Sequence, residues 1–67
     1  MNITVNNEPL TCEEDVLSVN RLLQKKNYTF KLLVVKINKK LIPKEDYDKS
    51  LIHEGDDVIV LHLMSGG

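Results

Sequence analysis

The sequence has few of the residues on which many functional sites depend. It contains one cysteine, Cys12, no tryptophan, two tyrosines and one phenylalanine among 67 residues. A single cysteine excludes a disulfide framework within the chain, and it excludes zinc or iron–sulfur sites built from several cysteines. The aromatic residues are scattered, so they form no stacking platform for nucleotide bases. We expect all three, Tyr28, Phe30 and Tyr47, to pack in the core.

An excess of charge is also lacking, because 9 basic residues face 10 acidic ones and the net charge is -1. Nucleic-acid binding needs a clustered excess of lysine and arginine, so nucleic acid is not an expected partner. One basic run exists, formed by Lys36, Lys39, Lys40 and Lys44. We interpret it as a solvated strand edge that its lysines keep soluble.

Long apolar runs and an N-terminal signal are lacking too. No stretch approaches the roughly 18 apolar residues of a membrane span, and no basic-then-apolar leader is present. We therefore expect no membrane partner and a location in the reducing cytoplasm. The length predicts one domain, residues 1–67, with little room for a deep substrate cavity. Because no paired nucleophile and base is visible either, a carrier or binding module is favoured over an enzyme.

The first part of the chain has the pattern of a β-hairpin followed by a helix. Ile3 and Val5 alternate with polar residues, which predicts a half-buried strand, a turn at 6–9 and a short returning strand at 10–12. Apolar residues at spacings of three and four then predict a helix within 13–26: Val16, Val19, Leu22 and Leu23. Thr11, Asp15 and Ser18 are all possible N-caps, and Asn27 is the expected terminator. Acidic residues precede this segment and lysines end it, an order that suits the helix dipole.

The second half of the chain is richer in strands. Residues 31–38 are apolar on both faces, which predicts a central strand. A turn at 38–40 and a brief strand at 41–42, which Pro43 stops, are expected to follow. Residues 44–50 suggest a single helical turn, and residues 57–64 the strongest strand. The order predicts an α+β fold, a four- or five-stranded mixed sheet curled around one helix, with the first and last strands as central neighbours.

The end of the chain is its most unusual feature. Only three glycines occur, and Gly66 and Gly67 are the last two residues. Without side chains, they let an extended tail enter a narrow channel of a partner. The terminal carboxylate is anionic at neutral pH, because its reference pKa is about 3.3–3.7, and adenylation would turn it into an acyl donor. A frayed tail explains the same pair, so the glycines alone leave both interpretations open.

Four short motifs connect this tail to the rest of the chain. They are Ile-Asn at 37–38, Leu-Ile-Pro at 41–43, Glu-Gly-Asp at 54–56 and Met-Ser-Gly-Gly at 64–67. In this order they resemble the ThiS family of ubiquitin-like sulfur carriers, over nearly the whole chain. The resemblance implies the β-grasp fold. It also implies that the glycine pair is a working tail.

The resemblance further implies a role for each residue of the tail. The Gly67 carboxylate would be adenylated with ATP by an E1-like partner of the ThiF type, then converted to a thiocarboxylate with sulfur from a desulfurase. It would give this sulfur to the thiazole of thiamine on a ThiG-type synthase. Gly66 and Ser65 would form the flexible tail. The chain itself would bind no cofactor and catalyse nothing.

Alternatives remain at this point. Related carriers serve molybdopterin synthesis or tRNA thiolation, and their fold and tail are the same. A ubiquitin-like interaction module with incidental glycines is the rival from another class. Intrinsic turnover by the purified chain would favour an enzyme.

The last strand also suggests a docking surface. One of its faces carries Val58, Val60, His62 and Met64, and the other carries Ile59, Leu61 and Leu63. If the helix covers the second set, the first stays open beside the tail and would dock the activating enzyme. Packing of this face on the short strand near Leu41 is the alternative.

The remaining candidates for chemistry have simpler interpretations. Cys12 is expected to be a small buried hydrophobe, because no neighbouring cation would activate its thiol. His53 and His62 lack the cysteine or carboxylate spacing of a metal site, so no metal is expected.

Overall fold

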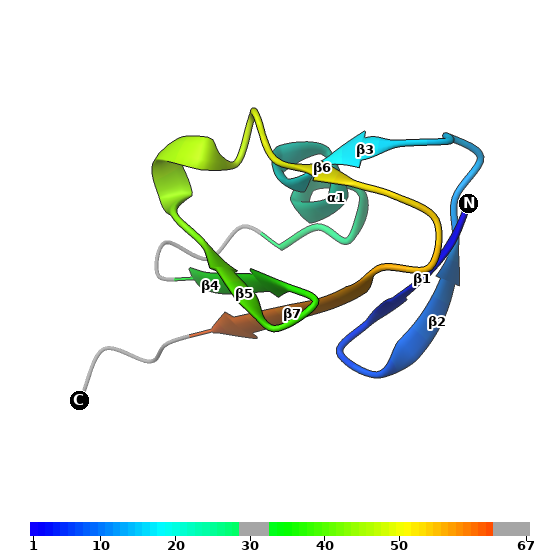
Figure 1. Cartoon of the computed structure of the whole chain (residues 1–67), viewed down its shortest axis with the longest axis horizontal. Coiled ribbons are helices and arrows are strands. Elements are labelled where there is room, and N and C mark those ends of the chain that lie inside the picture. Colours follow the sequence, from blue (N-terminus) through cyan, green and yellow to red (C-terminus); the bar gives the residue numbers. More distant parts are fainter. Residues whose placement is uncertain (29–32, 63–67) are drawn as a thin grey trace.

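The computed structural model describes residues 1–28 and 33–62. Within them, a main sheet of five strands has the order β2-β1-β7-β4-β5 (Figure 1). Its strands are β1 (Asn2–Val5), β2 (Glu8–Thr11), β4 (Leu33–Ile37), β5 (Lys40–Ile42) and β7 (Asp57–His62). The pairing of β1 with β7 is parallel and the other pairings are antiparallel, so the sheet is mixed, as predicted.

Four further elements complete the fold of the described residues. A helix, α1 (Val19–Lys25), follows β3 (Leu17–Ser18), and a 3₁₀ turn, η1 (Lys44–Asp46), precedes β6 (Leu51–Ile52). The strands β3 and β6 pair as a second, two-stranded sheet beside α1 (Figure 1). One helix against a mixed five-stranded sheet is the α+β, β-grasp architecture expected from the sequence. The helical turn predicted within 44–50 is confirmed as η1.

Two tight turns join the hairpins of the main sheet. Asn6 and Asn7 have φ values of 53° and 68°, and Asn38 and Lys39 have φ values of 50° and 72°. Two consecutive residues with positive φ suit the right-handed twist of a two-residue hairpin, and asparagine tolerates that geometry well. The turn predicted at 6–9 is therefore too long, because Glu8 already begins β2. Lys40, predicted as part of the second turn, likewise begins β5.

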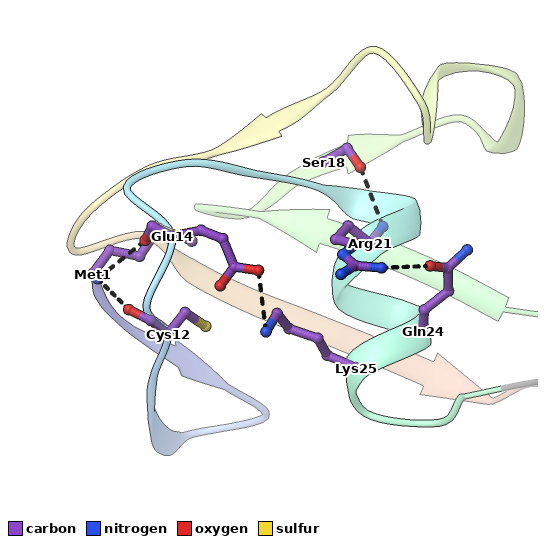
Figure 2. Close-up of polar contacts among 7 residues, drawn as sticks. All are labelled: Met1, Cys12, Glu14, Ser18, Arg21, Gln24 and Lys25. Carbon is purple, nitrogen blue, oxygen red and sulfur yellow. Dashed lines mark hydrogen bonds and ion pairs between the residues drawn. The ribbon is translucent and has the colours of Figure 1, made fainter.

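The helix is shorter than the predicted segment. Ser18 is its N-cap, and the Ser18 Oγ accepts a hydrogen bond of 3.2 Å from the Arg21 backbone N–H (Figure 2). Val16, which the helical pattern included, lies before the helix and is 41% exposed. The chain runs through β3 instead, because pairing with β6 satisfies its backbone and buries Leu17. Thr11 and Asp15 are therefore not caps.

The helix ends where the sequence indicates. Asn27 has a φ of 58°, its backbone N–H donates to Gln24 O at 3.1 Å, and the Tyr28 N–H donates to Leu23 O at 2.8 Å. These two bonds are those of a Schellman motif, which satisfies the last helical carbonyls. The prediction of Asn27 as terminator is confirmed.

The acidic residues before the helix do not interact with its dipole as predicted. Its first turn contains no acidic residue. Glu14 instead forms an ion pair of 3.1 Å with Lys25 at the other end of the helix (Figure 2). A backbone hydrogen bond of Glu14 and the Lys25 ammonium lower the pKa of the Glu14 carboxyl from its usual 4.5. The Met1 ammonium donates to Cys12 O at 2.6 Å and to Glu14 O at 3.2 Å. The segment from Cys12 to Glu14 is therefore held by the N-terminus and, through the Glu14 side chain, by the helix.

One core joins the helix to the main sheet. Its fully buried residues come from α1, β4, β6 and β7: Val19, Leu22, Val35, Ile52 and Val58. Cys12 and Tyr47 are also buried, which confirms both predictions, and Phe30 lies outside the described residues. Burial raises the pKa of Tyr47, whose hydroxyl donates to Leu33 O at 3.4 Å. Within the described ranges, no helix is long and apolar enough to cross a membrane.

Candidate functional site: the last strand and the open sheet face

The strand that leads to the C-terminus lies at the centre of the main sheet. Strand β7 has β1 on one side, through Thr4↔Asp57 and Val5↔Val58, and β4 on the other, from Ile37↔Val58 to Leu33↔His62. Its central position confirms the sequence prediction. The tail residues predicted to act, Met64, Ser65, Gly66 and Gly67, lie outside the described residues. The site is therefore built from the part of β7 that the structure describes.

An asparagine side chain extends the support of β7 beyond the end of β1. The Asn6 N–H donates to Val58 O at 2.9 Å, and the Asn6 Oδ1 accepts from the Val60 N–H at 2.8 Å. The side chain thus takes the place of the next backbone carbonyl of β1. The sequence pattern places Asn6 on the polar face of a strand and in a turn, and it gives no sign of this contact, which joins residues 54 positions apart. It fixes the strand two residues from its described end.

The Glu-Gly-Asp motif before β7 ties the start of the strand to two neighbours. Gly55 has a φ of 82°, which favours glycine, and its N–H donates to Asn2 O at 2.8 Å. The Glu54 carboxylate accepts from the Asn2 N–H at 3.0 Å. The Asn38 amide donates to Asp56 Oδ1 at 3.0 Å and accepts from the Asp57 N–H at 2.9 Å. Two of the quoted motifs, at 37–38 and 54–56, therefore meet and fix the base of β7.

The prediction of the docking face is wrong for two residues. Val58 is fully buried and Val60 is 7% exposed, and both belong to the core that contains Leu22. The helix therefore covers the side of β7 that was expected to stay open. Alternation showed which residues share a face, but both faces are apolar, so it did not show which one the helix covers. His62 is exposed, and Met64 lies outside the described residues.

The open face of the sheet carries the other residues of β7. Ile59 is partly buried and Leu61 is 47% exposed. Val34 of β4 is directly opposite Leu61, and Leu41 of β5, 59% exposed, completes the set. We call Val34, Leu41, Ile59 and Leu61 the open-face patch. It lies on β4, β5 and β7, three adjacent strands of the main sheet (Figure 1), and Leu61 is the residue before the described end of β7.

The other end of the open face is polar. Thr4 of β1 is opposite Asp57, and its hydroxyl donates to Asp57 Oδ1 at 2.9 Å. The apolar area of this face is therefore concentrated toward the end of β7 that leads to the tail. An apolar area of this kind suits a protein surface that binds a partner.

Chemical groups are sparse in the described part of the chain. The Cys12 thiol is in the core, which does not suit a nucleophile that must meet a substrate. No group of three His, Cys, Asp or Glu side chains that could hold a metal occurs in residues 1–28 and 33–62. What the arrangement offers is a rigid central strand next to an apolar surface.

Comparison with known proteins gives consistent matches along the whole chain. The model of the ThiS family matches residues 3–67. The crystal structure of the thiamine biosynthesis protein (ThiS) from Geobacter metallireducens is 32% identical, with a TM-score of 0.89 and full coverage of both chains. The solution structure of a thiamine biosynthesis protein from the same organism has a TM-score of 0.79 at 32% identity, covering 100% of this chain and 88% of the other.

A sequence relative comes from a different source. The uncharacterised protein ycf40 of Porphyra purpurea is 28% identical over 67 residues, which cover 100% of this chain and 93% of that protein. The matches span the described elements and the C-terminal motif alike.

Proposed function

This chain belongs to the ThiS family, and we propose from that membership that it is a sulfur carrier in thiamine biosynthesis. The family match extends to residue 67, so it includes the Gly66-Gly67 pair. The similar structure from Geobacter metallireducens is that of a thiamine biosynthesis protein. The carrier would act by its chain end and would depend on other proteins for catalysis.

In the proposed reaction, the carboxylate of Gly67 attacks the α-phosphorus of ATP on an E1-like enzyme of the ThiF type. Pyrophosphate leaves, and an acyl adenylate forms. The outer sulfur of a persulfide on the desulfurase then attacks the acyl carbon, AMP leaves and an acyl disulfide forms. A second thiol attacks the desulfurase sulfur of this disulfide, which releases the thiocarboxylate and leaves the two thiols joined as a disulfide. A carboxylate alone is a poor acyl donor, which is why activation must come first. The ThiG-type synthase would take this sulfur into the thiazole.

The central position of β7 carries this proposal. Pairing on both sides and the Asn6 contact hold β7 up to Val60, so a tail that follows would start from a fixed point. The two terminal glycines have no side chains, so they can extend the chain into a narrow site of a partner. A rigid base with a narrow end suits delivery of a carboxylate into the active site of another protein.

The open-face patch supports the second part of the proposal, which concerns docking. It replaces the face that the sequence predicted, and it lies on the three strands at the tail end of the sheet. We propose that the ThiF-type enzyme covers this patch while the tail reaches its ATP site. Exposed Leu41 and Leu61 would be buried by that contact.

The experiment is an intact-mass measurement. The full chain is incubated with ATP, a ThiF-type enzyme and a desulfurase with cysteine, and the expected result is exchange of one oxygen atom for sulfur. A chain that lacks Gly67 should fold and stay unmodified. Equal modification of the truncated chain would show that the terminal carboxylate is not the site.

A second experiment distinguishes thiamine biosynthesis from the related sulfur-transfer pathways. The loaded carrier is offered to a ThiG-type synthase and, separately, to a molybdopterin synthase large subunit. We expect sulfur transfer with the first alone. Transfer with the second alone would assign the carrier to molybdopterin.

A further inference from the structure

The lysines of the basic run occupy four different places in the fold. Lys40 is on the edge strand β5, Lys39 is in the tight turn and Lys44 begins η1. Lys36 differs, because its strand β4 lies between β7 and β5 and is not an edge. The interpretation as a solvated strand edge therefore fits Lys40 and is wrong for Lys36.

Lys36 lies among the apolar residues of the open-face patch. Its register partners are Ile59 on β7 and Leu41 on β5, so an apolar side chain stands directly opposite on each side. Side chains that face each other across such strands have Cβ atoms about 4.5–5.5 Å apart. Val34 and Leu61 form the next pair on the same face. Lys36 is exposed, and any protein that covers the patch would also cover its stem.

Within the described residues, Lys36 has no ion-pair partner on its own surface. Asp57 is on the same face, two residues before Ile59, and its Oδ1 accepts from the Thr4 hydroxyl. The ion pair found in residues 1–28 and 33–62 joins Lys25 and Glu14, and Lys36 forms none there. A carboxylate of a covering partner can therefore provide the counter-charge that Lys36 lacks in this structure.

We propose that Lys36 selects the docking partner, by pairing with a carboxylate set within an apolar surface of the activating enzyme. This inference rests on the proposed function and names what its docking surface recognises. A purely apolar surface would strip water from the ammonium without replacing it, and such burial is costly. A surface with a carboxylate in reach restores the interaction, so the lysine disfavours wrong partners and accelerates the encounter with the right one.

The test compares charge reversals at two exposed lysines. Lys36→Glu is measured against Lys49→Glu, which makes the same change in net charge between η1 and β6, away from the open face. The readout is the KM for the carrier in ATP-dependent loading by a ThiF-type enzyme. Lys36→Glu should raise KM by about tenfold or more with kcat nearly unchanged, and Lys49→Glu by less than about twofold. Thermal unfolding of each variant checks that the fold is kept.

Two further variants sharpen the result. Lys36→Met keeps the length of the side chain without its charge, and its KM should lie between those of the wild type and Lys36→Glu. A carboxylate-to-lysine change in the enzyme at the contact should restore loading of Lys36→Glu. Equal KM values for Lys36→Glu and Lys49→Glu would contradict the proposal.

Three other results would contradict the proposed role of Lys36. If Lys36→Met is loaded normally but forms dimers, the lysine acts only against self-association and the proposal fails. If the wild type is loaded and no Lys36 variant differs from it, the proposed function stands and this inference falls. If the wild type is not loaded at all, the proposed function falls, and the inference falls with it.

Discussion

The two faces of the main sheet carry similar residues under opposite conditions. Val35 and Val58 on the helix side are fully buried, whereas Leu41 and Leu61 on the other side are 59% and 47% exposed. Strand β7 supplies a member of each set, Val58 and Leu61, because its side chains alternate between the two faces. Burial against the helix stabilises the fold, and the exposed set stabilises nothing until a partner covers it. Stability and recognition are thus divided between the two faces and can be changed separately.

The largest effect is expected on stability, from a substitution in the core on the helix side of the sheet. Leu22→Ala leaves a cavity at a fully buried position and should lower the free energy of unfolding by about 2–5 kcal/mol. Leu61→Ala makes the same substitution on the open face and should change it by less than about 0.5 kcal/mol. Urea unfolding of both variants measures the contrast. Equal losses would show that the two faces do not differ in this way.

The next prediction concerns binding. Leu61→Ala should raise the KM of the carrier for its activating enzyme by about tenfold, because it removes an exposed apolar contact from the docking surface. Leu51→Ala is a matched control, since Leu51 is 48% exposed on β6, away from the patch. Its KM should stay near that of the wild type. A larger effect at Leu51 would move the docking surface to the other side of the molecule.

The next prediction concerns the stability that the Asn6 side chain provides by accepting from the Val60 N–H. Asn6→Gly keeps a residue that accepts positive φ but removes the acceptor of the Val60 N–H, which should cost about 1–3 kcal/mol. Asn7→Gly changes the neighbouring turn residue and should cost less. Unfolding and amide exchange at Val60 measure the difference. Unchanged exchange at Val60 in Asn6→Gly would show that the side chain is not needed there.

The smallest effect is a pH dependence at the helix. Glu14 has a lowered pKa, so its contribution to stability is present above its usual 4.5 and is lost as the pH falls through the lower, folded value. Glu14→Gln should therefore have a slightly lower Tm than the wild type at pH 7, and the two should converge at acidic pH. A Tm difference that persists in acid would assign the effect to packing. Lys25→Met should reproduce part of the loss at pH 7.

Local patterns predicted much of this fold. Several of its features depend only on residues that are close in sequence. They are the alternation of Ile3 and Val5, the tolerance of Asn27 for positive φ, and the apolar character of β4 and β7. The central pairing of β1 with β7 followed from treating the first and last strands as neighbours. The family resemblance supplied the name of the fold.

Long-range contacts explain what the patterns missed. Three residues could cap the helix, and the choice of Ser18 depends on β3 pairing with β6, more than 30 positions away. The role of Asn6 depends on Val60, and its side chain gave no local signal. The face that carries Val58 and Val60 was wrongly expected to stay open, because both sides of β7 are apolar and only packing against the helix distinguishes them.

The most direct test of the central claim locates the sulfur in the loaded protein. Fragmentation mass spectrometry of the full chain, after reaction with ATP, a ThiF-type enzyme and a desulfurase, should place one sulfur-for-oxygen exchange on Gly67. Cys12 should be unmodified, and a Cys12→Ala variant should be loaded to the same extent. An added sulfur on Cys12, with Gly67 unchanged, would contradict the account.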